Sequence, residues 1–113
     1  MIDKEQFKEN FAPFDKEIVL EIIDIFIDEY DDRMNELAKN IQENDLESLR
    51  FNAHSFKGVV ANFVAETPKA ISKQLEENAK NNVSDNNLEL FNQLKEATGE
   101  LLNDLKELRP EYM

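Results

Sequence analysis

Apolar residues recur at intervals of three and four along nearly the whole 113-residue chain, and this period limits the fold more than any other feature. A helix buries one such stripe, whereas a half-buried strand needs strict alternation, so the pattern predicts amphipathic helices and no strands. The longest stripe, expected between residues 15 and 43, consists of Val19, Ile22, Ile23, Phe26, Ile27, Tyr30, Met34, Leu37 and Ile41. The next consists of Leu46, Leu49, Ala53, Phe56, Val60 and Phe63.

Turn and capping residues divide the chain into five predicted helices. A short helix from Ile2 to about Asn10 ends before Pro13, and Asp15 caps the long second helix. Thr67 is expected to cap a fourth helix that begins at Pro68 and ends near Lys80. The fifth helix is expected to start after a cap at position 84 or 85 and to end before position 110. Because the turns are short, we predict a single all-α domain over residues 1–113, an antiparallel up-down four-helix bundle with a short extra N-terminal helix.

The charge of the chain argues against two classes of partner. Thirteen basic residues stand against 25 acidic ones, so the formal net charge is −12. Nucleic acid and anionic membrane surfaces would both be repelled by that field, and neither is expected as a partner. The N-terminus lacks the apolar core of a signal peptide, and no stretch approaches the roughly 18 apolar residues of a membrane span. A cytoplasmic location is therefore expected.

His54 is the only histidine, and the chain has no cysteine and no tryptophan. On a helical wheel it falls about 130° from the centre of the core stripe, so it is expected to face outward. Arg50 and Lys57 stand one turn before and after it and bring two cations to the same surroundings. Imidazole is a competent nucleophile near neutral pH, and these cations would attract an anionic group, so a phosphoryl group is the natural substrate.

Gly58 follows His54 on the outward side of the same predicted helix. A glycine inside an exposed helix costs on the order of 1 kcal/mol relative to alanine, so the position requires a reason. We expect that a partner approaches the backbone there, and that Ala61 and Ala65 continue the bare stripe. A purely structural bundle would give no reason for Gly58. A metal site is not expected, because His54 has no second histidine or cysteine nearby to complete a ligand set.

The segment Ala53-His54-Ser55-Phe56-Lys57-Gly58 resembles the His-x-x-Lys-Gly signature of histidine-containing phosphotransfer (HPt) domains. Ala61-Asn62-Phe63 and the stretch Leu75-Glu76 with Ala79 also resemble the family pattern, and the resemblance extends over essentially the whole chain. One departure concerns Val64, where many members have a second glycine. The chain contains no nucleotide-binding loop, so the resemblance implies a phosphoryl carrier without ATP-dependent kinase activity of its own.

The resemblance also implies roles for particular residues. His54 would be phosphorylated, Lys57 would offset the charge of the phosphoryl group, and Gly58 would leave space for it. The expected partners are response-regulator receiver domains, which would donate and accept the phosphoryl group, and a hybrid sensor histidine kinase. The receiver would bring Mg²⁺, and no cofactor would be bound by this chain. The partner-binding surface is expected to comprise Arg50, Ser55, Ala61, Asn62 and Ala65, with Lys69 at its rim.

Two alternatives stay open at this point. The chain is either a free-standing protein or the excised end of a hybrid kinase. In both cases it is expected to be a monomer, as HPt modules of this length generally are. It is either a carrier or an HPt-like bundle that only binds a receiver or another partner without being phosphorylated.

Overall fold

The computed structural model describes residues 3–113, and all regular structure in this part of the chain is helical. The elements are α1 (Lys4–Phe11), α2 (Lys16–Gln42), α3 (Leu46–Ala61), α4 (Glu66–Lys80), α5 (Asn87–Leu108) and the short 3₁₀ helix η1 (Arg109–Tyr112). The prediction of an all-helical fold is confirmed. The expected contribution of Ile2 to the first helix lies outside the described residues.

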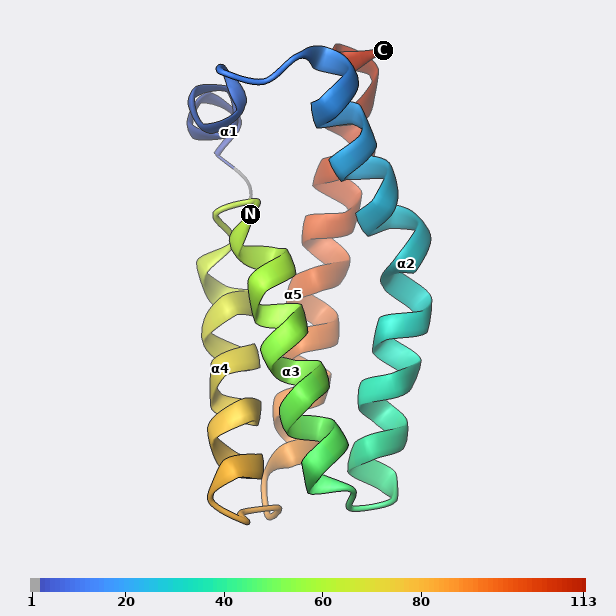
Figure 1. The fold of residues 1–113 in the computed structure, drawn as a ribbon, viewed down its shortest axis with the longest axis vertical. Helices are drawn as coiled ribbons and strands as arrows, with labels where there is room; N and C mark the ends of the chain where they lie inside the picture. Colours follow the sequence, from blue (N-terminus) through green and yellow to red (C-terminus); the bar gives the residue numbers. More distant parts are fainter. Residues whose placement is uncertain (1–2) are drawn as a thin grey trace.

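Four helices, α2 to α5, lie side by side along the long axis of the molecule (Figure 1). The α2–α3 and α4–α5 turns are at one end and the α3–α4 turn is toward the other, so consecutive helices run in opposite directions (Figure 1). The apolar stripes meet between them in one core, in which Val19, Ile23, Leu49, Leu94 and Leu101 are fully buried. Each stripe requires a partner to exclude water, and the side-by-side arrangement supplies one for every helix.

The first helix, α1, covers the end of the bundle where α2 extends beyond α3. Because α2 has 27 residues and α3 only 16, α2 extends beyond α3 by several turns. Phe7 and Phe11 of α1 are buried in the space that this leaves, with Phe7 stacked on Phe63 at a ring-centroid distance of 6.4 Å. Tyr112 of η1 contacts Phe7 edge-on at 5.9 Å, so the two ends of the chain are packed together here.

The start of α4 differs from the sequence expectation. The helix begins at Glu66 with Ala65 as its N-cap residue, so Thr67 and Pro68 lie inside the first turn, and the prediction that Thr67 is the cap is wrong. Proline is accepted there because the first N–H groups of a helix have no intrahelical partner. The fifth helix is capped by Asn86, shortly after the two candidate positions, and ends at Leu108 as the following proline requires.

Val64 adopts a left-handed backbone conformation with φ of 54° in the turn between α3 and α4. Such a conformation suits glycine and is rare for a β-branched residue, because its Cβ crowds the backbone. The departure from the HPt pattern noted in the sequence therefore falls on the one position of this turn where glycine would relieve strain.

The contrast between two phenylalanines of α3 tests this packing. Phe56 is 1% exposed and Phe51 is 74% exposed, although they lie five residues apart on the same helix. Phe56→Ala should lower the free energy of unfolding by about 3–5 kcal/mol, because it leaves a cavity in the core. The matched change Phe51→Ala should stay within about 0.5 kcal/mol of the parent chain. Urea denaturation measures both, and equal effects would show that α3 is rotated differently.

Candidate functional site

The rotation of α3 places His54 at the surface. Leu49, Ala53, Phe56 and Val60 face the core and are essentially inaccessible to water. At about 100° per residue, this burial turns His54 outward, and its side chain is 67% exposed. The sequence prediction of an outward-facing histidine agrees with this placement.

Arg50, Lys57 and Ala61 lie on the same face of α3 as His54, because they are separated by intervals of three and four residues. Gly58 adjoins this face, and a Cβ atom built on it would have no other atom within 4 Å apart from its own helix. The glycine is therefore not required by packing inside the molecule. The surface beside His54 is open at that point.

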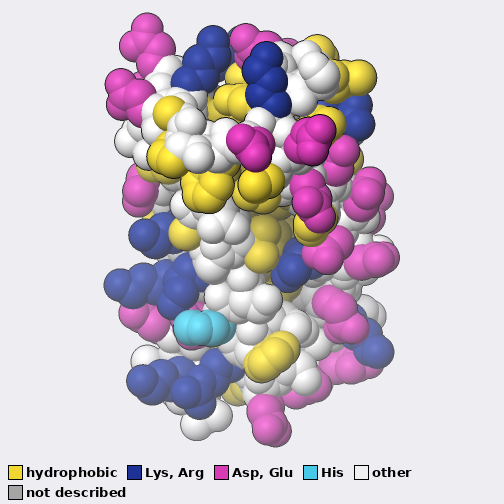
Figure 2. All heavy atoms as spheres, turned by 45° about the horizontal axis from the view of Figure 1, so that its top comes forward, with side chains coloured by type: hydrophobic (Ala, Val, Ile, Leu, Met, Phe, Trp, Pro, Cys, Tyr) yellow, Lys and Arg dark blue, Asp and Glu magenta, His cyan; other side chains and the backbone are white. Residues whose placement is uncertain are grey.

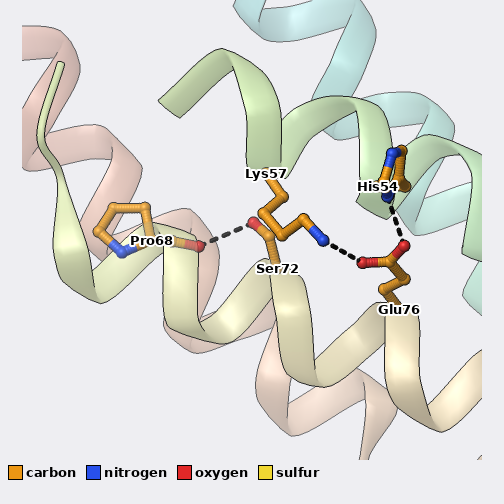
Figure 3. Close-up of polar contacts among 5 residues, drawn as sticks. All are labelled: His54, Lys57, Pro68, Ser72 and Glu76. Carbon is orange, nitrogen blue, oxygen red and sulfur yellow. Dashed lines mark hydrogen bonds and ion pairs between the residues drawn. The ribbon is translucent and has the colours of Figure 1, made fainter. Parts of the chain in front are cut away.

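Glu76 of α4 connects His54 to Lys57 (Figure 3). Its Oε2 atom lies 2.5 Å from His54 Nδ1, and its Oε1 atom accepts a hydrogen bond from Lys57 Nζ at 2.6 Å. The Glu76 side chain is only 17% exposed, so solvent screens this pair of contacts less than it would a surface ion pair. One carboxylate thus holds both residues that the sequence singled out.

The close approach of α3 to α4 allows a short glutamate side chain to reach both partners. These two helices share the most extensive contact in the bundle, and each contributes small residues to the buried part of the molecule, Ala53 on α3 and Ser72 and Ala79 on α4. The Ser72 hydroxyl donates a hydrogen bond to the Pro68 carbonyl at 2.7 Å (Figure 3), so its polar group is satisfied within α4. Small and self-satisfied side chains let the two backbones pack closely.

The ionisation of Glu76 fixes the tautomer of His54. Partial burial on its own raises the pKa of the Glu76 carboxyl, but hydrogen bonds from Lys57 and His54 outweigh burial and leave the pKa below its ordinary value of 4.5. An ionised carboxylate can only accept hydrogen bonds, so His54 Nδ1 carries the proton. In a neutral imidazole the lone pair then resides on Nε2, and Nε2 has no hydrogen-bond partner among residues 3–113. In the neutral ring, the contact therefore favours the tautomer with the proton on Nδ1 and the lone pair on Nε2.

The remaining predicted surface residues fall into three groups. Asn62, the C-cap residue of α3, and Lys69 are exposed. Ser55 is half-buried on the side of α3 that faces α2, where Arg33 donates a hydrogen bond to its hydroxyl at 3.4 Å. The prediction that Ala65 continues the outward stripe is wrong: α3 has already ended at Ala61, and Ala65 is 2% exposed within the core.

Two residues of the site were missed by sequence reasoning. Phe51 is strongly exposed and lines an open hollow together with Arg50, His54 and Glu76. Its place in the sequence, three residues before His54, was a usable signal, because a large apolar residue outside the core stripe requires an explanation. Glu76 was noted only as part of a family pattern, since nothing local indicates a partner 22 residues away.

Two further features of residues 3–113 concern ligands and membranes. No group of three or more His, Cys, Asp or Glu side chains is placed to hold a metal ion within this part of the chain. None of the helices described combines the length and the apolar character needed to cross a membrane.

The fold is all-helical, and one helix face exposes a histidine next to a lysine and a glycine with open space around it. These features define a class of histidine-bearing helical domains. Comparison with protein families identifies which one: the family model described as the Hpt domain matches residues 21–109, and the chain belongs to this family. Comparison with curated proteins, and with solved structures, found no match. Hpt domains carry out histidine phosphotransfer in phosphorelay signalling and interact with receiver and kinase partners in two-component systems.

Glu76→Gln should lower the free energy of unfolding by about 1 kcal/mol at neutral pH, because it removes the charge shared by Lys57 and His54. Since the folded-state pKa of Glu76 is lower than the ordinary 4.5, the stabilisation is fully present above that pH and is lost as the pH falls through the folded value. The difference between parent and variant should therefore shrink below about pH 4.5. Urea denaturation at several pH values measures it.

The adjacent and exposed Glu77 provides the control. Glu77→Gln should leave the free energy of unfolding nearly unchanged over the same range. If both variants lose the same stability with the same pH dependence, the bridge between α3 and α4 does not contribute to folding.

Proposed function

We propose that this chain is a phosphorelay intermediate in which His54 accepts a phosphoryl group from the aspartate of one receiver domain and passes it to another. The scaffold is the family's antiparallel up-down four-helix bundle, with α1 as a short extra N-terminal helix. The observation that carries the proposal is the contact of Glu76 with Nδ1 of the exposed His54 side chain. In the neutral ring this contact leaves the lone pair on Nε2, which has no hydrogen-bond partner among residues 3–113. Membership of the Hpt family supports the same reaction.

The transfer is a displacement at phosphorus. His54 Nε2 attacks the aspartyl phosphate in line, an N–P bond forms, and the bond between phosphorus and the carboxylate oxygen breaks. The electron pair leaves with the receiver's carboxylate, and the ring acquires positive charge. Glu76 offsets that charge from the Nδ1 side, as a carboxylate does for the imidazolium of a hydrolase triad. The reverse reaction returns the phosphoryl group to an aspartate.

Lys57 and Gly58 serve the arriving group. The hydrogen bond from Lys57 Nζ to Glu76 already holds the ammonium group close to His54. A short side-chain movement brings its charge to a phosphoryl oxygen. Gly58 leaves room for the phosphoryl group and the partner's active-site loops. The receiver supplies Mg²⁺, and no cofactor is bound by this chain. Phe51 and Arg50 add an apolar and a charged contact at the edge of the same surface.

Phosphorylation of His54 is tested by incubation with receiver domains that have been phosphorylated with acetyl phosphate, followed by intact-mass measurement. The parent chain should gain one phosphoryl group, and the adduct should be acid-labile, as a phosphohistidine is. His54→Gln should gain none. An exposed residue is replaced here, so circular dichroism should show unchanged helicity. If no receiver produces an adduct, the chain is a binding module and the proposal is wrong.

Gly58→Ala separates a role in folding from a role in transfer. Neither Gly58 nor Gly99 of α5 would bring an added Cβ within 4 Å of a neighbour, so alanine should stabilise both helices, by up to about 1 kcal/mol each. Gly58→Ala should nevertheless slow transfer from a phosphorylated receiver, because the methyl group occupies the approach to His54. Gly99→Ala, distant from that surface, should leave the transfer rate unchanged.

The two measurements are the free energy of unfolding and the rate of adduct formation. Faster or unchanged transfer in Gly58→Ala would show that the glycine is not kept for the approach of a partner.

A further inference from the structure

The acidic charge of the chain is unevenly distributed. Residues 46–80, which contain α3, α4 and the turn between them, carry five basic and four acidic side chains, a formal net charge of +1. The rest of the chain carries eight basic and 21 acidic side chains, a net charge of −13. The helix pair that bears His54 is therefore slightly positive in an otherwise acidic chain, and it repels an anionic partner less than the rest of the chain does taken together.

Three of these basic residues share one face of α4. Lys69, Lys73 and Lys80 fall within about 60° of one another on a helical wheel, and Glu76 lies in the same sector. All three lysines are exposed. Since Glu76 contacts His54, this sector is the side of α4 that adjoins the exposed face of α3.

The opposite directions of α3 and α4 distribute these lysines on both sides of His54. From Glu76, the residues toward the start of α4 run alongside the end of α3, so Lys69 and Lys73 lie beyond Lys57. Lys80 lies the other way, toward Arg50. Figure 2 shows that Lys and Arg side chains, in dark blue, lie both above and below the single cyan histidine on this face. Glu76, which could oppose them, is already engaged by His54 and Lys57.

We propose that Lys69, Lys73 and Lys80 form a docking stripe on α4 that contacts an acidic protein surface on the receiver and guides it onto His54. This rests on the function proposed above and adds the chemistry of the partner. A receiver carrying a phosphorylated aspartate presents negative charge at its reacting end, which complements the stripe. A long polyanion such as nucleic acid, or an anionic membrane, would also meet the −13 charge of the remaining surface, so a compact acidic protein face fits better.

The stripe should act mainly on the rate of association. Attraction between charged surfaces raises association rates and is screened by salt, with a Debye length of about 10 Å at 0.1 M ionic strength. The double variant Lys69→Glu/Lys73→Glu should therefore reduce the second-order rate constant of phosphoryl transfer about tenfold at low ionic strength. The deficit should shrink to less than about twofold in 0.5 M salt.

A control variant of equal charge separates the stripe from net charge. Lys95 and Lys106 are exposed on α5, which lies behind α3 in the view of Figure 1. Lys95→Glu/Lys106→Glu changes the net charge by the same amount, and it should alter the rate constant by less than about twofold. Lys69→Gln/Lys73→Gln should give an intermediate loss, and circular dichroism checks that each variant is folded.

The outcomes distinguish this inference from the proposed function. If the parent chain forms the phosphoryl adduct but both charge-reversed pairs behave alike, or the rates do not depend on salt, the docking stripe is wrong and the carrier function stands. If no receiver phosphorylates the parent chain, the carrier function fails, and the receiver-docking role of the stripe fails with it. If the α4 variant alone loses binding to phosphatidylserine vesicles while its transfer rate is unchanged, the stripe faces a membrane and the proposal is overturned.

Discussion

Burial of one face of α3 is the constraint on which the rest of the site depends. Phe56 is a core residue of α3, and its ring packs against Phe26 of α2 at a centroid distance of 6.4 Å. A close-packed core fixes the rotation of a helix to within a few tens of degrees, because any other rotation would expose Phe56 or bury a charged neighbour. The backbone of His54, Lys57 and Gly58 faces away from the core for this reason, and Glu76 then fixes how the His54 and Lys57 side chains lie.

The second constraint is a single, largely buried carboxylate. A charge in such a position requires compensation, and Glu76 obtains it from His54 and Lys57, the two residues proposed to carry the chemistry. The same contacts that stabilise Glu76 as an anion orient the imidazole and keep Lys57 near it. Folding and reactivity are thus linked through one side chain of α4, and the arrangement needs no other polar residue inside the bundle.

The helices and the outward position of His54 were predictable from the sequence, because both follow from a local period of three to four residues. The bridge to Glu76 was not, since it depends on how α3 and α4 pack against each other and joins residues 22 positions apart in the sequence. The exposed position predicted for Ala65 assumed that α3 continued past residue 61. The helix ends at Ala61, and the left-handed turn at Val64 directs the chain into α4 instead. Local patterns therefore predicted the exposed histidine and missed the carboxylate that contacts it.

The order of helices along the chain has a consequence for how such proteins diverge. His54, Lys57 and Gly58, proposed for chemistry, are on α3, and the three lysines proposed for docking lie along the exposed side of α4, while α2 and α5 supply most of the remaining core. Because the lysines of α4 project into solvent, they are free to be exchanged with little effect on folding. After gene duplication, two copies of such a chain could acquire different signalling partners through changes at a few surface codons of α4, with α3 unaltered. Insulation between parallel pathways would then need only a few substitutions.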